Sequence, residues 1–279
     1  MSIPSHLATT TIRSGGAEAV IAHHGAHVLS FVPEGGQDLL WVSEQAIFKP
    51  GKAIRGGIPV CWPWFADHPT DSNMPAHGVA RTSMWDLEST TGDSANFALV
   101  DTAETRELWS HSFKLHLIVT VTPTSLEVVF EAKNRGHTPV TTTAALHTYF
   151  SVSDASAIDI SGLEGTNYID KMADDTLIKQ DGEIRISAEV DRIYLDTTAD
   201  CLLADPGMDR TIRVAKSGSQ STVVWNPWEA KARRMRDFGD EEYKEMVCIE
   251  TCNAGTDIVV VAPGEVHRLV ATLSVEPEK

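Results

Sequence analysis

The chain has 279 residues, of which 42% are hydrophobic and 22% are charged. This balance is ordinary for a globular protein and argues against extensive disorder. The length fits one large β domain or two smaller ones. The net charge of −16, from 23 basic and 39 acidic residues, repels nucleic acid and anionic lipid, so we expect neither as a partner. An anionic metabolite would bind only where basic residues converge locally.

Targeting signals are not expected in this sequence. The first ten residues lack the basic and apolar regions of a secretory signal, and no apolar run approaches the roughly 20 residues that span a bilayer. The four cysteines form no CxxC pair; they are Cys61, Cys201, Cys248 and Cys252. We therefore expect a cytoplasmic protein with reduced, mostly buried thiols.

Short β-branched or alternating segments dominate the chain and predict strands. They are 19–21, 28–31, 39–42, 114–121, 126–132, 140–150, 211–214, 222–225, 246–250, 257–262 and 266–275. Turn-forming residues lie between many of them, at 33–36, 134–136, 205–207, 216–219 and 263–264. Many short strands at this spacing predict a mainly β protein, an antiparallel sandwich or barrel.

One short helix is predicted among the strands. Asn226 can cap it, Pro227 suits its first turn, and it would run to about Asp237 and end near Gly239. Its basic residues are predicted to form a solvated face; they are Arg233, Arg234 and Arg236. No repeat, linker or change in composition divides the chain, so we predict a single domain over residues 1–279.

The segment 54–65 reads IRGGIPVCWPWF and combines Arg55 with two glycines, two prolines and three aromatic residues. Gly56 and Gly57 would let the backbone approach a ligand closely. Rigid aromatic walls suit the apolar C–H faces of a sugar. The same composition is also typical of a proline-rich loop that covers the core with its aromatic residues.

A second segment, 75–81, reads PAHGVAR and places His77 and Arg81 on either side of Gly78. Histidine exchanges protons near neutral pH, and arginine binds phosphate oxygens through two parallel hydrogen bonds. A surface loop with a solvated arginine is the simpler alternative.

A third segment, 140–150, reads VTTTAALHTYF. On a strand, His147 would share one face with Thr141, Thr143, Ala145 and Tyr149, a pattern compatible with the floor of a groove. The alternative is a half-buried structural histidine bonded to backbone.

A fourth segment, 226–254, contains a mostly apolar strand that Glu250 ends. A carboxylate that leaves such a strand in a low-dielectric mouth becomes more basic. An exposed glutamate at a strand end is the alternative.

His23, His24 and His27 lie around Gly25 in a predicted hairpin and could suggest a metal site. No acidic or thiol ligands accompany them, so no metal is expected there. The sequence has no P-loop, no GxGxxG turn after a strand and no GxSxG elbow.

Together, segments 54–65, 75–81, 146–150 and 226–253 occur in the order and with about the spacing of a known family. The sequence resembles the hexose-6-phosphate mutarotase branch of the aldose 1-epimerase family, over nearly its whole length. The resemblance implies a β-supersandwich and the interconversion of the α and β anomers of a hexose 6-phosphate. It implies no cofactor and no metal. We expect a monomer.

The resemblance also implies roles for individual residues. His147, in LHTYF, matches the general acid that protonates the ring oxygen, and Glu250, in VCIE, matches the general base that takes the proton of the anomeric hydroxyl. The departure from the family pattern is small: Thr251 and Cys252 follow the base where Ser or Pro and a small residue are more usual. That difference concerns the edge of the pocket.

The remaining matches concern substrate binding. Arg55 and Arg81 match the arginines that hold the phosphate, His77 lies in the pocket-lining HGxAR motif, and Asp191, in VDRIY, matches a carboxylate that binds sugar hydroxyls. Three alternatives remain open: an epimerase of unphosphorylated aldoses, a non-catalytic carbohydrate-binding or regulatory protein on the same scaffold, and a histidine-rich metalloprotein.

Overall fold

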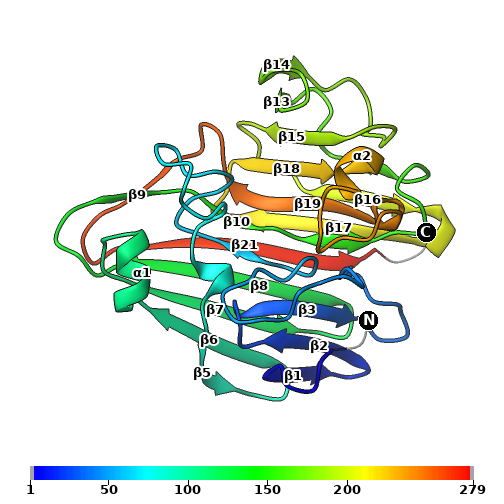
Figure 1. Ribbon diagram of the computed structural model, residues 1–279. Helices are drawn as coiled ribbons and strands as arrows, with labels where there is room; N and C mark the ends of the chain where they lie inside the picture. Colours follow the sequence, from blue (N-terminus) through cyan, green and yellow to red (C-terminus); the bar gives the residue numbers. More distant parts are fainter. Residues whose placement is uncertain (1–2, 277–279) are drawn as a thin grey trace.

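The computed structural model describes residues 3–276, and two eight-stranded antiparallel sheets make up most of it (Figure 1). A common apolar core joins the two sheets, because residues of both sheets pack in one cluster. The prediction of a mainly β sandwich of antiparallel strands is therefore confirmed.

The first sheet carries the longest strands. In spatial order they are β12 (Asp159–Ser161), β16 (Cys201–Asp205), β17 (Arg210–Ser217), β21 (Val266–Val275), β8 (Ser125–Asn134), β7 (Phe113–Val121), β6 (Ser94–Val100) and β5 (Asp86–Thr90).

The second sheet positions the site. Its order is β14 (Thr176–Lys179), β13 (Asn167–Asp170), β15 (Val190–Tyr194), β18 (Ser221–Asn226), β19 (Met246–Asn253), β10 (Ala144–Leu146) and β4 (Val60–Cys61), and β11 (Tyr149–Ser151) also pairs with β19. The smaller sheets contain β1 (Thr9–Ser14), β2 (Ala17–Ala22) and β3 (His27–Val32), and β9 (Val140–Thr142) with β20 (Val259–Val261).

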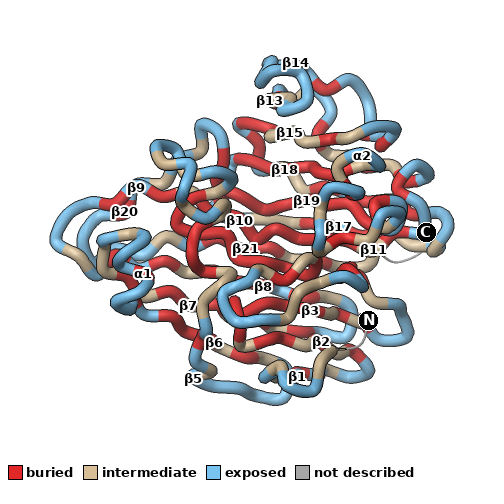
Figure 2. The backbone as a smooth tube through the Cα atoms, viewed as in Figure 1, coloured by how far each residue is buried: buried red, intermediate tan, exposed pale blue. Residues whose placement is uncertain are grey.

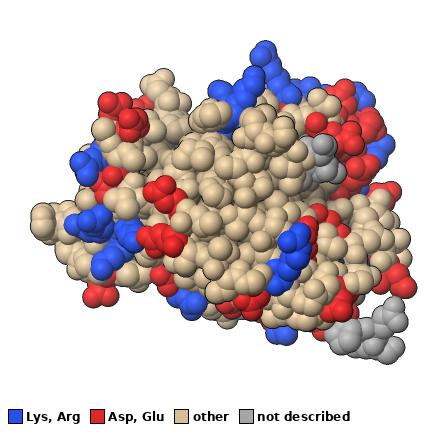
Figure 3. Space-filling view, turned by 90° about the horizontal axis from the view of Figure 1, so that it is seen from below, with Lys and Arg blue, Asp and Glu red and all other residues tan. Residues whose placement is uncertain are grey.

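Burial follows the two-residue period of a strand. In β7, buried residues alternate with partly exposed ones, so this sheet buries one face. In β18 and β19 every residue is buried, because the main core covers one face and a second cluster covers the other (Figure 2). One face of the molecule shows acidic and basic side chains around a centre that carries few charges (Figure 3).

Several predicted boundaries were wrong. The segment 140–150 is not one strand but three, β9, β10 and β11, with His147 between the last two. The segment 39–42 makes only isolated bridges, Leu40 with Phe150 and Val42 with Gly56. Strands outside the predicted set are mostly short or mixed in polarity, which gives a weak alternating signal; they are β1, β4, β5, β6 and β12 to β16.

The predicted helix is shorter than expected. It is α2 (Trp228–Ala232), and Asn226 does support its start, since its Oδ1 accepts a hydrogen bond from the Trp228 amide at 2.8 Å. The chain then turns so that Phe238 packs on Trp41, with ring centroids 4.9 Å apart. Arg233, Arg234 and Arg236 are exposed, as predicted.

A second helix, α1 (Ala103–Leu108), was not predicted. Thr102 and Thr105 form its capping box. The helix is only six residues long, so it shows no apolar periodicity that would support this capping signal in the sequence. All four cysteines are buried and free, as expected. Neither helix within residues 3–276 has the length and apolarity that crossing a bilayer requires.

Candidate active site

Strand β19 and its neighbours bring Glu250 and His147 together. Side chains alternate along β19, so Glu250 lies on the same face as Cys248 and Cys252, away from the main core. β10 pairs Leu146 with Thr251, and β11 pairs Tyr149 with Cys248. This register is continuous across the break between the two strands and therefore places His147 opposite Glu250.

The imidazole Nε2 of His147 lies 3.4 Å from Oε1 of Glu250, and both side chains are buried. The remaining polar atoms of the pair, His147 Nδ1 and Glu250 Oε2, have no hydrogen-bond partner within residues 3–276. Buried polar atoms without partners are rare and concentrate where a protein binds or transforms something. The pair is therefore arranged for contact with a ligand.

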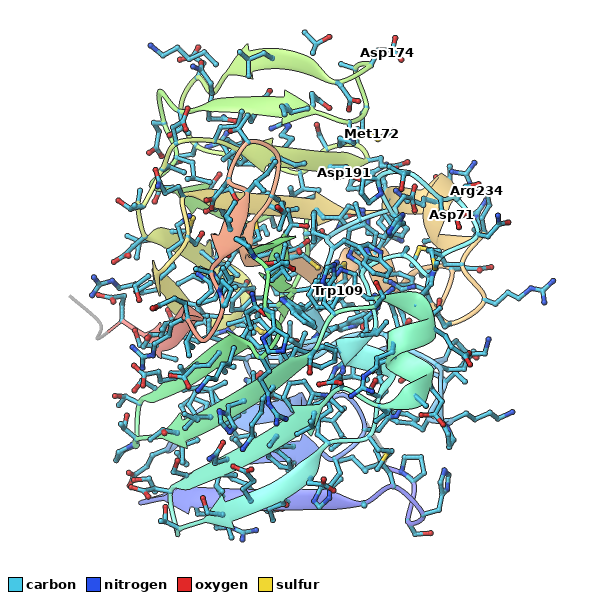
Figure 4. The ribbon with its side chains drawn as sticks, turned by 90° about the vertical axis from the view of Figure 1, so that its left-hand side faces the viewer. Asp71, Trp109, Met172, Asp174, Asp191 and Arg234 are labelled. Atoms are coloured by element: carbon cyan, nitrogen blue, oxygen red, sulfur yellow. The ribbon has the colours of Figure 1, made fainter. Side chains whose placement is uncertain are left out.

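A cavity of about 350 Å³ opens over this pair, within the roughly 300–1,000 Å³ common for small-molecule sites. Five of the six predicted site residues line it: Arg55, His77, His147, Asp191 and Glu250. Its aromatic walls come from Phe65, Tyr149 and Trp225. Figure 4 labels Asp191, with Met172 and Asp174 above it and Asp71 and Arg234 to its right.

Burial governs the proton affinities of the pair. It lowers the pKa of His147 well below the ordinary value of 6.5, and the nearby charges of His77, Arg81 and Arg55 lower it further. Burial also raises the pKa of Glu250 well above 4.5, with Asp191 adding to the rise and Arg81 opposing it. The pocket thus disfavours the charged form of both groups, so the histidine is a strong acid and the glutamate a strong base.

Aromatic rings surround the imidazole of His147. Tyr149 lies parallel to it, with centroids 4.7 Å apart and an interplanar angle of 8°. His77 and Trp225 meet it edge-on, at 5.6 Å and 6.2 Å. Burial lowers the pKa of His77 as well, so this ring is neutral near pH 7.

Arg55 reaches the cavity wall but already has partners. Its NH1 donates to the Tyr149 hydroxyl at 3.0 Å, and NH2 lies 3.1 Å from Oδ2 of Asp237. Burial acts against its charge, but Tyr149 and Asp237 outweigh that effect and raise the pKa of Arg55. Its side chain remains 24% exposed, which leaves the guanidinium accessible to a ligand.

Arg81 is the one predicted site residue that does not line the cavity. Its NH2 donates to the backbone oxygen of Ala76 at 2.9 Å, and its Nε is buried without a partner within the described residues. Its charge nevertheless lowers the pKa of both His77 and His147.

The glycines of the first segment have a different role from the predicted one. A Cβ on Gly56 would lie 2.4 Å from the Trp41 backbone oxygen, and one on Gly57 would lie 2.2 Å from that of Val28. Both adopt positive φ, 112° and 61°. They permit close packing against neighbouring backbone, rather than the approach of a ligand.

Asp191 faces the cavity from β15, and burial raises the pKa of its carboxyl. Lys231 of α2 lies 3.9 Å from it and 3.0 Å from Glu189. Lys171 also lines the cavity. Both lysines oppose the effect of burial on Asp191.

The three clustered histidines do not share a binding site. The Nε2 atoms of His23, His24 and His27 meet different oxygens: Thr10 Oγ1 at 2.9 Å, Lys52 O at 2.7 Å and Gly56 O at 2.7 Å. Burial lowers the pKa of His27 to about 3. Within residues 3–276, the potential metal ligands that converge within 4.8 Å are His147, Cys248 and Glu250. Burial raises the pKa of Cys248, which opposes the thiolate that a metal would need.

Sequence reasoning missed several residues of the site. Tyr149 was placed on the face of His147 but given no role, and Asp237 was treated only as a helix end. Lys231 lay in a helix whose charges suggested a solvated face. Period-two spacing from His147 is the signal that could have identified Tyr149; the approach of Asp237 to Arg55 is a long-range contact that no local pattern encodes.

Comparison with known proteins places this geometry in context. Residues 8–274 match the family model described as aldose 1-epimerase. Proteins named "Putative glucose-6-phosphate 1-epimerase" from Cenchrus ciliaris and Escherichia coli K12 are each 38% identical, over 93% and 85% of this chain and 82% and 80% of their own. A crystal structure titled "putative mutarotase" from Salmonella typhimurium superposes with a TM-score of 0.90 at 34% identity, covering 98% of this chain and 91% of that one. The chain belongs to the aldose 1-epimerase family.

Proposed function

We propose that this protein interconverts the α and β anomers of a hexose 6-phosphate, with His147 as general acid and Glu250 as general base. The observation that carries the proposal is the buried His147–Glu250 pair, 3.4 Å apart, at the floor of a cavity that Arg55 also lines. The names of the two 38% identical relatives support the choice of a 6-phosphorylated hexose.

The proton balance of the reaction suits this pair. Glu250 takes the proton of the O1 hydroxyl while His147 delivers one to the ring oxygen O5, so the C1–O5 bond breaks and an aldehyde forms. Rotation about C1–C2 then presents the other face of the aldehyde, and closure returns both protons. No electron or group is lost, so two protein groups suffice.

The buried environment affects both sides of the opening step. The pair must be imidazolium and carboxylate to start that step, a state that burial disfavours, and both groups are neutral after it. Since burial disfavours the charged forms, it favours the protonation state that accompanies the open-chain sugar. Each proton transfer of this kind contributes about 10²–10⁴-fold in rate.

The phosphate requires positive charge in a chain whose net charge is −16. Arg55 lines the cavity, and the buried Nε of Arg81 has no hydrogen-bond partner within residues 3–276. We assign both to phosphate binding, His77 to the pocket wall, and Asp191 to the sugar hydroxyls. No cofactor or metal is needed.

The pairing of Arg55 with Asp237 favours a second candidate, an epimerase of unphosphorylated aldoses. A guanidinium that already has a carboxylate partner does not need a phosphate. The two candidates differ in substrate, not in chemistry, so the same assay separates them.

The deciding experiment follows anomer exchange by proton NMR for α-glucose 6-phosphate and α-glucose, each with and without protein. The proposal expects faster exchange of the phosphorylated sugar, with a much smaller effect on glucose. Equal acceleration of both sugars would favour the second candidate, and acceleration of neither would refute both.

We also infer that residues 1–279 form one domain and act as a monomer in the cytoplasm without nucleic acid or membrane partners. A single core cluster that includes residues from Ile12 to Leu273 supports the first point. The acidic net charge supports the absence of nucleic acid.

A further inference from the structure

In the described part of the chain, the imidazole of His147 does not make the hydrogen bond that usually orients a catalytic histidine. In many enzymes one ring nitrogen is held by a carboxylate or backbone carbonyl while the other reacts. Here Nδ1 has no partner within residues 3–276, and Nε2 faces Glu250, which is its partner in the reaction. Among the described residues, the contacts that can fix the plane of the ring are therefore those with neighbouring rings.

Tyr149 is the side chain with the geometry to do this. Its ring lies 4.7 Å from that of His147 and within 8° of parallel. Tyr149 is itself only 1% exposed. Its ring stacks on that of Trp41, with centroids 5.8 Å apart, and meets the ring of Trp225 edge-on at 6.0 Å. Its backbone pairs with Cys248 of β19, two residues before Glu250. The Tyr149 ring is thus held firmly enough to fix the orientation of the His147 imidazole that stacks on it.

The hydroxyl end of Tyr149 contacts a different part of the site. It accepts a hydrogen bond from NH1 of Arg55 at 3.0 Å, while Asp237 binds the other edge of the guanidinium. One rigid side chain therefore contacts both the acid and the cation assigned to the phosphate.

We propose that Tyr149 is a positioning residue that sets the imidazole plane of His147 through its ring and the Arg55 guanidinium through its hydroxyl. The inference rests on the proposed function. It makes two separable claims, one for each end of the side chain. The aromatic ring of Tyr149 should matter for every aldose, because opening of the sugar ring needs the acid His147. The hydroxyl of Tyr149 should matter only for substrates that carry a phosphate, because it positions Arg55.

Two variants separate these claims. Tyr149→Phe keeps the ring and removes the hydroxyl, so kcat/KM for glucose 6-phosphate should fall about tenfold, mainly through KM, with little change for glucose. Tyr149→Leu removes both, so kcat should fall about three- to tenfold for either sugar, in addition to the loss of phosphate selectivity. Tyr243→Phe is the matched control: it removes the hydroxyl of another tyrosine of the same cluster, one that does not line the cavity, and should leave both sugars unaffected.

A measurement independent of turnover tests the packing. The ring current of Tyr149 should shift the His147 Hε1 resonance, assigned by its loss in His147→Asn. The contribution of Tyr149 should persist in Tyr149→Phe and be lost in Tyr149→Leu, where only the contributions of His77 and Trp225 remain. If Tyr149→Leu does not fold, Tyr149→Phe still tests the hydroxyl.

The outcomes are distinguishable. An inactive wild type would refute the proposed function. An active wild type whose Tyr149→Phe variant matches it on both sugars would overturn the role of the hydroxyl. A His147 resonance without a ring-current shift in the wild type would overturn the role of the ring.

Discussion

The two faces of β19 differ in what they bury: one buries apolar side chains in the main core, and the other carries Glu250 at the candidate site. Val247 and Ile249 point into the main core, where their neighbours are apolar. Cys248, Glu250 and Cys252 point to the second cluster, where buried polar atoms of the site lack hydrogen-bond partners among the described residues. One face gains stability from packing; the other keeps polar groups ready for a ligand, at a cost in stability.

The comparison teaches why this strand looked ambiguous in sequence. A strand buried on both faces loses the alternation of polar and apolar residues that marks a half-buried strand. Glu250 then stands out as the charged residue of a buried run. Its alternative interpretation, an exposed strand end, is wrong, because β19 continues to Asn253 and Glu250 is 1% exposed.

The largest expected effect is a loss of turnover caused by changing the site face of β19 and its partner His147, without changing the core face. His147→Ala and Glu250→Gln should each lower kcat for glucose 6-phosphate by at least about 10²-fold, the scale for losing one general acid or base. Steady-state NMR anomer-exchange rates measure this, and circular dichroism checks that both variants remain folded. Near-normal turnover in either variant would contradict its assigned role.

A core substitution should have the opposite signature. Phe130 in β8 is fully buried in the main cluster, and Phe130→Ala should lower the free energy of unfolding by about 3–5 kcal/mol. Denaturant titration measures this loss. At temperatures where the variant stays folded, kcat should change less than twofold, because Phe130 does not line the cavity. A large loss of kcat in the folded variant would mean that the two regions are coupled.

How much the sequence predicts follows the same division. The strands β7, β8 and β21 were predicted closely, because alternation over nine or ten residues is a strong local signal. Five of the six predicted site residues converge on one cavity, but the family resemblance carried that prediction. The position of Arg81, the partner of Arg55 and the break at His147 depend on contacts between distant segments, which no local pattern encodes.

A smaller effect on kcat/KM is expected from the two arginines assigned to the phosphate. Arg55→Ala and Arg81→Ala should each lower kcat/KM for glucose 6-phosphate by roughly ten- to a hundredfold, since a partly hydrated phosphate loses one charge-assisted partner. Activity on glucose should change much less, because that sugar carries no phosphate and loses only the influence of the arginine charge on the pKa of His147.

The measurement is kcat/KM for both sugars in the wild type and both variants. Asp237→Asn offers a matched test, because it removes the carboxylate that competes for Arg55 without removing the cation. It should leave phosphate selectivity equal or higher. Equal loss on both sugars in the arginine variants would exclude a phosphate-specific role.

The smallest expected effect concerns stability and follows from the raised pKa of Glu250. Burial raises that pKa above the ordinary value of 4.5, so the folded protein holds a proton that the unfolded chain has released. As pH rises from about 4.5 through the folded pKa, the wild type should therefore lose stability, by at most about 1.4 kcal/mol per pH unit.

Glu250→Gln cannot ionise, so it should not lose this contribution. The lowered pKa of His147 affects stability only up to about pH 6.5, which overlaps the lower part of this window, so the comparison is made above pH 6.5. The difference between their free energies of unfolding, measured by urea titration at several pH values, therefore isolates Glu250. It should grow with pH in favour of the variant that has lost activity. A difference that stays constant with pH would mean that the carboxylate is not disfavoured in the folded state, and the cost assigned to the site face of β19 would then be absent.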